Sequence, residues 1–160
     1  MKFSIIVPSF NQEHFIDDTL SNLVEIKQKA KEKGISVEIL VFDSESNKNV
    51  QASINKFKEH LDYIEIKKDL GQYDAINKGI LKSTGDYWTW LNTDDLMNVE
   101  GFLKLADILK KNSAIDYIYG GVNYINEKGE VTKHYNSYPL DLKTLYSHTP
   151  AIFQPGSFLK

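Results

Sequence analysis

Short apolar runs alternate along the chain with longer segments in which apolar residues recur at helical spacing. Four runs have the length and composition of buried strands, at residues 3–7, 37–42, 63–66 and 87–91. Each is followed by an amphipathic segment of helical period, at residues 15–33, 50–60, 73–83 and 99–111. A strand–helix order repeated four times predicts a parallel sheet with helices on both faces. The chain is therefore expected to adopt an α/β, Rossmann-like fold with a mostly parallel sheet.

The alternation stops after the fourth helical segment. Two β-rich segments follow, at residues 117–125 and 131–135, and the Asn-Glu-Lys-Gly between them is typical of a hairpin turn. We therefore predict a small β-hairpin region after residue 115. Residues 140–148 are expected to form a short helix. Residues 151–160 are expected to form a strand at the edge of the sheet or the wall of a binding site.

Two adjacent carboxylates, Asp94 and Asp95, follow the fourth apolar run. Like charges side by side repel, so one of the pair tends to take up a proton unless a cation shares them. Mg²⁺ and Mn²⁺ prefer such oxygen ligands and usually complete their shells with phosphate oxygens. The alternative is an exposed turn in which one of the two carboxylates caps the next helix. The pair alone leaves both interpretations open.

Polar segments also follow the first two apolar runs, at residues 8–11 and 43–46. The carboxyl ends of parallel strands meet at one edge of a sheet, and ligands of such folds bind beyond that edge. Residues 8–11, 43–46 and 92–95 are therefore expected to share one crevice. Asn11 is expected to cap the helix that follows it.

The composition excludes several classes of function. All 19 basic residues are lysine and the net charge is −3, so arginine forks are unavailable and a basic surface for nucleic acid is not expected. There is no cysteine, which rules out disulfides and thiolate metal sites. No apolar run reaches the roughly 18 residues of a membrane span. We expect no nucleic-acid partner, no transmembrane segment in this chain, and a cytoplasmic location, which includes the inner face of the membrane.

Four motifs follow one another in order along the chain. They are I-I-V-P-S-F-N-Q, V-F-D-S-E-S, D-L-G-Q-Y-D-A-I-N-K-G and T-G-D-Y-W-T-W-L-N-T-D-D. Together they resemble the N-terminal, nucleotide-sugar-binding part of the inverting family 2 glycosyltransferases, which have the GT-A fold. The resemblance covers nearly the whole chain. It implies one GT-A-like domain over residues 1–160, with 1–112 as the nucleotide-binding half and 113–160 as the start of the acceptor-side half.

The resemblance implies a base pocket at the ends of the first two strands. Pro8 and Phe10 would line the nucleobase pocket, and Asp43 would accept a hydrogen bond from the base, for which a uracil N–H is the usual donor. The alternative for Asp43 is a cap or turn residue. Ser44-Glu45 replaces the small glycine pair that the family usually carries, and an extra acid beside the base pocket would weaken or redirect nucleotide binding.

The resemblance also implies a metal site for Mn²⁺ or Mg²⁺. Asp95 would coordinate the metal directly, and Asp94 would contact the donor ribose or a metal-bound water. Asp74 would face the donor, with helix capping as the alternative. Lys78 is either a phosphate contact or a solvated helix lysine, and we favour the second interpretation.

The implied reaction transfers a sugar from a nucleotide-sugar donor, a UDP-sugar, to a hydroxyl of a saccharide or lipid-linked saccharide acceptor, with inversion. The metal would neutralise the diphosphate leaving group, and a carboxylate base would deprotonate the acceptor. In the family that base lies well downstream, and Asp141 is the one carboxylate after Glu130. We therefore expect the general base to lie beyond Lys160, and the chain to be truncated at its C-terminus and to turn over poorly.

Two other classes remain as alternatives. One is a non-catalytic module that binds nucleotide and metal. The other is a sugar nucleotidyltransferase, which would need a glycine-rich basic loop where this chain has P-S-F-N-Q. The sequence contains neither the G-x-G-x-x-G of a dinucleotide-binding enzyme after the first strand nor a P-loop. Polysaccharide assembly is the pathway class that the resemblance favours.

Overall fold

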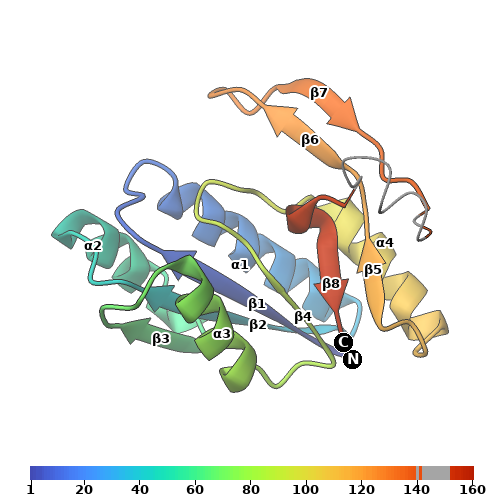
Figure 1. The fold of residues 1–160 in the computed structure, drawn as a ribbon, viewed down its shortest axis with the longest axis horizontal. Coiled ribbons are helices and arrows are strands. Elements are labelled where there is room, and N and C mark those ends of the chain that lie inside the picture. Colours follow the sequence, from blue (N-terminus) through green and yellow to red (C-terminus); the bar gives the residue numbers. More distant parts are fainter. Residues whose placement is uncertain (140, 142–151) are drawn as a thin grey trace.

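A computed structural model describes residues 1–139, 141 and 152–160 of the chain. In this part of the chain one sheet has six strands, in the order β3-β2-β1-β4-β8-β5 (Figure 1). These strands are β3 (Tyr63–Ile66), β2 (Ser36–Asp43), β1 (Lys2–Ser9), β4 (Tyr87–Trp90), β8 (Ser157–Leu159) and β5 (Tyr117–Tyr119). The strands from β3 to β4 are parallel, and β8 pairs antiparallel with both of its neighbours. The predicted mostly parallel α/β sheet is confirmed.

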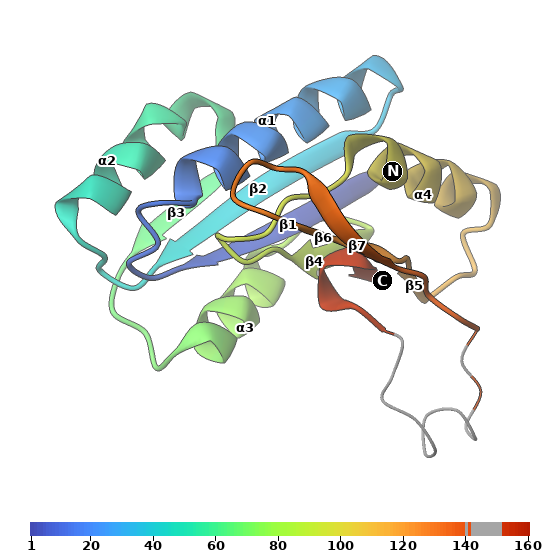
Figure 2. The same ribbon diagram turned by 90° about the horizontal axis from the view of Figure 1, so that it is seen from above.

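Helices cover both faces of this sheet, as predicted. They are α1 (Ile16–Glu32), α2 (Lys48–Lys56), α3 (Gln72–Lys82) and α4 (Val99–Lys111), with short 3₁₀ helices at Lys58–His60 and Gln154–Gly156. Figure 2 shows α1, α2 and α4 on one face and α3 on the other. Because both faces are covered, the parallel strands read as continuous apolar runs and do not alternate with polar residues.

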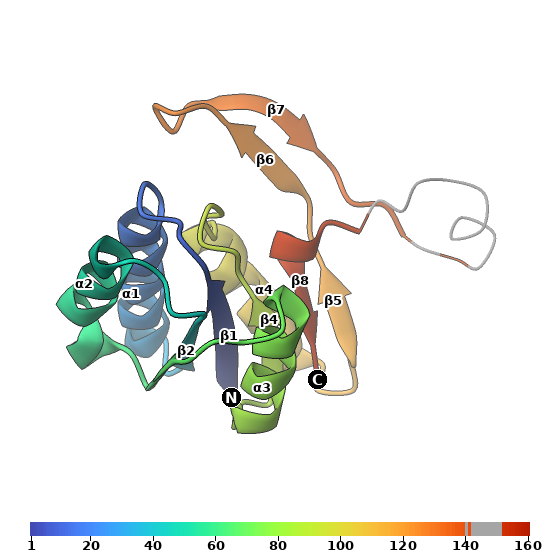
Figure 3. The ribbon, with the colours of Figure 1, turned by 60° about the vertical axis from the view of Figure 1, so that its left-hand side comes forward.

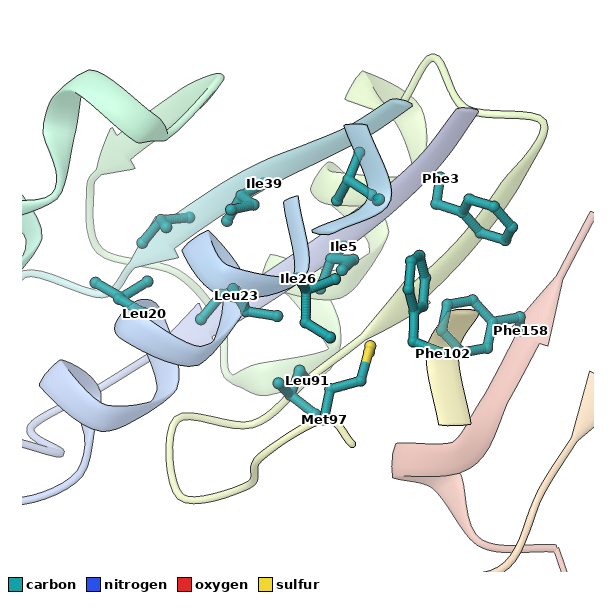
Figure 4. Close-up of a cluster of buried hydrophobic side chains, with 14 of the residues drawn as sticks. Phe3, Ile5, Leu20, Leu23, Ile26, Ile39, Leu91, Met97, Phe102 and Phe158 are labelled. Atoms are coloured by element: carbon teal, nitrogen blue, oxygen red, sulfur yellow. The ribbon is translucent and has the colours of Figure 1, made fainter. Parts of the chain in front are cut away.

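The larger core lies between the sheet and the three-helix face. Figure 4 shows its centre, where side chains of β1 and β2 meet those of α1. At one end Phe3, Phe102 and Phe158 pack together, with ring centroids 5.1, 5.8 and 5.9 Å apart. Each fully buried aliphatic or aromatic side chain contributes about 1.5–3 kcal/mol to folding. This core fixes β1 as the central strand of the sheet.

A smaller core holds α3 against the opposite face. Ile6, Leu40, Phe42 and Ala75 are buried there, and Trp88 and Trp90 pack against them from β4. The indole rings of the two tryptophans stack with centroids 6.3 Å apart. These tryptophans are therefore part of the packing of the sheet.

Gly79 sets how closely α3 approaches β1. A Cβ at this position would lie 2.4 Å from Ile6 Cγ2, well inside van der Waals contact. The glycine that ends the D-A-I-N-K-G motif is therefore required by helix–strand packing.

We expect Gly79→Ala to destabilise the protein by about 1–3 kcal/mol, because the added methyl overpacks the core, although alanine is the better helix former. Urea denaturation measures the loss. Asn77→Ala, on the exposed side of the same helix, is the control and is expected to be close to neutral. Equal stability of the two variants would contradict the close-packing account.

The segment after α4 differs from the prediction in two respects. The predicted hairpin is present as β6 (Val122–Ile125) and β7 (Val131–Tyr135), but residues 117–119 instead join the main sheet as β5. β8 lies between β4 and β5, so the expectation of a sheet-edge strand at 151–160 is wrong. Phe158 explains the position, because its ring, 2% exposed, needs the aromatic core beneath it. The predicted helix at 140–148 lies almost entirely outside the described residues.

The β6–β7 hairpin stands apart from the main sheet, on the side to which the loops after β1 and β4 project (Figure 3). Its base is held by ring contacts of Tyr135 with Tyr124 and Phe153, at centroid distances of 5.2 and 5.6 Å. Gly121 lies so close to Tyr135 that a Cβ would come within 2.4 Å of its carbonyl oxygen. The rest of the hairpin is largely exposed.

A buried carboxylate ties the strands together at the amino edge of the sheet. Glu38 is 6% exposed and accepts hydrogen bonds from Ser4 Oγ at 2.6 Å and from the backbone N–H and Oγ1 of Thr84 at 2.7 and 2.8 Å. Lys2 forms an ion pair with it. Burial raises the pKa of Glu38, but the hydrogen bonds outweigh burial and lower this pKa from 4.5 to about 2.

Because the folded-state pKa of Glu38 is depressed, its contribution is present above the unfolded-state pKa and is lost as the pH falls towards 2. We expect Glu38→Gln to lower the free energy of unfolding by about 2–3 kcal/mol near pH 7. The variant is also expected to flatten the pH dependence in the acid range, as measured by urea denaturation. Glu25→Gln, an exposed site on α1, is expected to keep the wild-type slope. A wild-type slope in Glu38→Gln would exclude this carboxylate as the acid-sensitive group.

In the described part of the chain, no helix has both the length and the apolar character that crossing a membrane requires.

Candidate functional site

The polar segments singled out in the sequence meet at the carboxyl edge of the sheet. β1 and β2 pair in register as far as Ser9 and Asp43, so residues 8–11 and 43–46 leave the sheet side by side. β4 ends beside β1, and the Leu91 N–H donates to the carbonyl of Ile6. The loop that carries Asp94 and Asp95 therefore begins next to the end of β1. The predicted gathering of these segments at one edge is present in the structure.

Asp43 is buried at the end of β2, with 1% of its surface exposed. Its Oδ1 accepts hydrogen bonds from the hydroxyls of Ser9, at 2.8 Å, and Ser46. Its Oδ2 accepts the backbone N–H of Ser46 at 2.9 Å. The carboxylate thus closes the turn after β2, and one lone-pair position on Oδ2 remains. The turn alternative accounts for most of the hydrogen bonds of Asp43, while its contact with a base stays a prediction.

The turn from Asp43 to Ser46 carries an unusual backbone conformation. Glu45 has a φ of +50°, a left-handed value that costs most L-residues about 1–2 kcal/mol and that glycine adopts freely. A turn with positive φ at its third residue ordinarily requires glycine or asparagine. Glu45 is exposed at the protein surface. The departure from the glycine pair noted in the sequence therefore falls on the residue whose backbone most needs a glycine.

Asn11 does not cap α1, contrary to the prediction. The helix begins at Ile16 without a side-chain cap. Asn11, with a φ of +53°, instead accepts the Asn47 N–H at 3.1 Å through its side chain and donates its own N–H to Ser46 Oγ at 2.9 Å. The chain needs four further residues to turn into α1, so Asn11 lies too far from the helix start and joins the first two strand-end loops instead.

The two residues predicted to line the base pocket differ in exposure. Pro8 is buried within β1, where it shapes the end of the strand. Phe10 follows at the surface, with 61% of its side chain exposed. An exposed ring at a strand end is available for stacking on a flat ligand, whereas Pro8 supports the backbone behind it. Base contact by either residue stays a prediction.

The loop with the acid pair is held by the first helix. Thr19 Oγ1 lies 2.9 Å from the carbonyl oxygen of Thr93 and 3.0 Å from that of Asp95. One turn further along α1, Asn22 exchanges two hydrogen bonds with the backbone of Met97, at 2.8 and 3.0 Å. Two polar side chains of α1 therefore fix the backbone of the acid pair.

Asn92 connects this loop to α3. Its Oδ1 accepts from Gln72 Nε2 at 2.6 Å, and its Nδ2 donates to Asp95 Oδ2 at 3.2 Å. Asp94 is exposed and Asp95 is half-buried. Burial, and then the charge of Asp94, raise the pKa of Asp95, while the hydrogen bond from Asn92 opposes them. A divalent cation between these carboxylates would relieve both unfavourable effects.

The described residues contain no group of three or more acidic, histidine or cysteine side chains arranged to hold a metal ion. A cation at this edge would therefore rely on Asp94 and Asp95 and complete its shell with ligand or water oxygens. Mg²⁺ and Mn²⁺ are ordinarily bound by one or two carboxylates plus phosphate oxygens. The residues present fit such an ion.

Asp74 lies in the first turn of α3, near the same edge. Its Oδ2 accepts the Leu70 N–H at 3.1 Å and lies 2.9 Å from Lys78 Nζ. The Lys78 hydrogen bond, and then the Leu70 N–H, lower the pKa of Asp74. These contacts do not cap α3, which begins at Gln72 without a side-chain cap, and a donor contact of Asp74 stays a prediction. Lys78, which also approaches Glu65 at 3.9 Å, is an ion-pairing surface lysine.

A separate hollow of about 260 Å³ lies between α3 and β3. Its lining residues are Phe42, Tyr63, Glu65, Lys78, Leu81 and Lys82. None of the residues predicted to bind the base or the metal is among them, so we do not assign this hollow to the candidate site.

Sequence reasoning missed the residues that hold the site together. Ser9 and Ser46 fill three of the lone-pair positions of Asp43. Thr19 and Asn92 hold the acid pair, and Gln72 links α3 to the loop that carries it. Thr19 had a signal, because it is a hydroxyl residue in the apolar stripe of α1. The others are polar residues in polar loops, and the sequence does not distinguish them from solvated neighbours.

Comparison with known proteins identifies the class. The family model "Glycosyl transferase family 2" matches residues 4–158. The chain therefore belongs to glycosyl transferase family 2.

Solved structures share the fold at low sequence identity. TarS 1–349 from Staphylococcus aureus, in complex with UDP-GlcNAc, aligns over 99% of this chain and 45% of its own, with a TM-score of 0.73 and 20% identity. The mannosyltransferase PcManGT from Pyrobaculum calidifontis, in complex with GDP-Man and Mn²⁺, aligns over 78% of this chain and 35% of its own, with a TM-score of 0.57 and 19% identity. The GT-A architecture is thus confirmed.

Among curated proteins, the poly-β-1,6-N-acetyl-D-glucosamine synthase of Staphylococcus aureus is 24% identical over 132 residues, which are 81% of this chain. An uncharacterized glycosyltransferase of Rickettsia conorii is 28% identical over 134 residues, or 82% of this chain. The aligned parts are 31% and 21% of those proteins. The chain thus spans less than a third of these relatives.

The raised pKa of Asp95 leads to a stability prediction. A carboxyl group whose folded-state pKa lies above its unfolded value destabilises the protein once it is ionised, and this penalty disappears as the pH falls through the folded-state pKa. We therefore expect Asp95→Asn to raise the Tm of the metal-free protein near pH 7, with a gain that shrinks towards about pH 4. Differential scanning calorimetry measures both values. Asp107→Asn on α4 is the control, and a Tm below wild type near pH 7 would contradict the prediction.

Proposed function

We propose that this chain forms the donor-binding part of a metal-dependent glycosyltransferase. The reaction transfers a sugar from a nucleotide-sugar, a UDP-sugar, to a hydroxyl of a saccharide or lipid-linked saccharide, with inversion. Family membership supports the activity class. A polysaccharide synthase among the relatives supports polysaccharide biosynthesis as the setting, and UDP-GlcNAc in TarS supports the donor class.

One observation carries the proposal. Asp94 and Asp95 lie beyond β4, at the sheet edge where Asp43 and Phe10 also lie, on a backbone that Thr19 fixes. A pair of acids held against α1, with one of them half-buried, is costly without a cation. The same edge carries the residues that the family resemblance assigns to the nucleotide.

Different side chains would bind the metal, the phosphates and the base of the donor. Asp95 and Asp94 would hold Mn²⁺ or Mg²⁺, and the bound ion would neutralise charge on the diphosphate leaving group. With no arginine in the chain, the remaining phosphate contacts fall to lysine and backbone N–H groups. The free lone pair of Asp43 Oδ2 suits the single imide N–H of uracil. The exposed Phe10 ring follows Ser9, and the Ser9 hydroxyl donates a hydrogen bond to Asp43.

Four of the described carboxylates at this edge, Asp43, Asp74, Asp94 and Asp95, already have other roles, and the exposed Glu45 lies in the turn that carries Asp43, on the base side of the proposed donor site. Asp43 is held by serines and Asp74 by Lys78, and the acid pair is assigned to the metal. We therefore propose that residues 1–160 bind donor and metal but transfer sugar slowly on their own. Rapid transfer by the purified chain to a saccharide acceptor would contradict this part of the proposal.

The second candidate is a non-catalytic module that binds nucleotide and metal. The hydrogen-bonded carboxylates Asp43 and Asp74 favour it, because neither is free to deprotonate an acceptor. The two candidates are distinguished by assaying the purified protein for release of UDP from a UDP-sugar, with and without metal. Metal-dependent release points to the enzyme, and binding without release points to the module.

The binding site is tested by calorimetric titration of UDP into the protein, with and without Mn²⁺. We expect Mn²⁺ to strengthen binding in the wild type and to have no such effect in Asp95→Ala, because one carboxylate holds the ion weakly. Asp94→Ala is expected to weaken the Mn²⁺ effect to a smaller extent.

Asp107→Ala, which removes a carboxylate from α4, is the matched control and is expected to behave as wild type. Absence of UDP binding under all conditions would count against the proposed donor site. Mn²⁺-dependent binding that survives in Asp95→Ala would leave the acid pair as a loop element without a role in metal binding.

A further inference from the structure

Glu45 is an exposed carboxylate at the proposed donor edge, and local packing does not explain it. It takes no part in the hydrogen bonds and ion pairs that the described residues form with one another, and its backbone is left-handed. The acids near it differ: Asp43 is bound by Ser9 and Ser46, and Asp74 by Lys78. A glutamate therefore occupies a backbone position that suits glycine, and no hydrogen bond or ion pair of its side chain with the described residues compensates for this conformation.

Asp43, the carboxylate assigned to bind the base, can accept few further hydrogen bonds. A carboxylate offers about four lone-pair positions, and three of those of Asp43 are filled by Ser9 and Ser46. It can accept at most one further N–H. Any second donor on the base edge would need another acceptor, and Glu45 is the acid two residues further along the same turn.

The turn that carries Glu45 is fixed on both sides. The Ser44 N–H donates to the Ser9 carbonyl at 2.9 Å, and Ser44 Oγ accepts from the Asp69 N–H at 3.1 Å. Ser46 is bound to Asp43 and to the Asn11 N–H. The backbone of Glu45 cannot leave the edge without breaking these contacts, so its charge stays in the turn that carries Asp43.

We propose that Glu45 shifts the nucleobase selectivity of the donor site, strengthening the binding of a base with an exocyclic amino group beside a ring N–H relative to uracil. This inference rests on the proposed nucleotide-sugar site. Guanine offers two adjacent donors, one for Asp43 and one for Glu45. Uracil offers one N–H between two carbonyl oxygens, and a second carboxylate beside such an oxygen is repulsive. Glu45 thus acts against the preference for uracil that Asp43 alone would give.

The inference is tested by measuring the affinities of GDP, IDP and UDP in saturating Mn²⁺ for the wild type and for Glu45→Gln. IDP has the same ring N–H as GDP but lacks the amino group. In the wild type we expect GDP to bind more tightly than IDP. In Glu45→Gln the affinity of GDP relative to IDP, and relative to UDP, should fall by about tenfold, the typical effect of losing a charge-assisted hydrogen bond.

Glutamine retains the shape and the left-handed backbone of Glu45, so the variant isolates the charge. Glu25→Gln on α1 controls for the general loss of one negative charge and should keep the wild-type ratios. Equal GDP-to-IDP and GDP-to-UDP ratios in the wild type and in Glu45→Gln, with binding retained, would overturn the inference. Failure of all three nucleotides to bind the wild type would instead remove the proposed function, and this inference with it.

Discussion

The register of β1 against β2 is the constraint on which the rest of the structure depends. The two strands pair over eight residues and end together at Ser9 and Asp43. Because β1 is buried on both faces, by the three-helix core on one side and by α3 on the other, it cannot slip without exposing both cores. The position of every loop at the carboxyl edge follows from this register, including the contact of Ser9 with Asp43.

The two edges of the sheet use carboxylates in opposite ways. At the amino edge Glu38 is fully bonded, and its pKa is lowered to about 2. At the carboxyl edge Asp95 is half-buried beside a like charge, and its pKa is raised. The first arrangement stabilises the folded protein without a ligand. The second leaves unfavourable electrostatics that a cation would remove, as is common where a protein binds its ligand.

Much of the fold was predictable from the sequence, because the parallel strands are covered on both faces and so appear as apolar runs. The placement of the three-residue strands β5 and β8 within the main sheet was not, since so short a segment carries no period and its pairing depends on the burial of Phe158 in the aromatic core. Asp94 and Asp95 were recognisable from their position after a strand. The hydrogen bonds that occupy most of the Asp43 carboxylate were not, because they depend on the register that brings Ser9 beside it.

The left-handed backbone of Glu45 shows a different limit. Glutamate gives no local signal for positive φ, and only the turn geometry, set by Asp43 and Ser46, imposes it. The departure from a glycine-rich motif was visible in the sequence. Its physical meaning required the backbone angle and the hydrogen bonds of the neighbouring acids.

The exposure of the β6–β7 hairpin affects how the sequence of such a protein can diverge in evolution. The close approach of Gly121 to Tyr135 lies within the hairpin, and the ring of Tyr135 contacts that of Phe153 near the start of β8. Most of the hairpin side chains face solvent. Substitutions there disturb neither core, so stability hardly constrains its sequence. The carboxyl edge proposed to bind the donor, in contrast, is tied into the register of the central strands. Within the part of the chain that the structure describes, the hairpin is thus the element most free to diverge while the fold is kept.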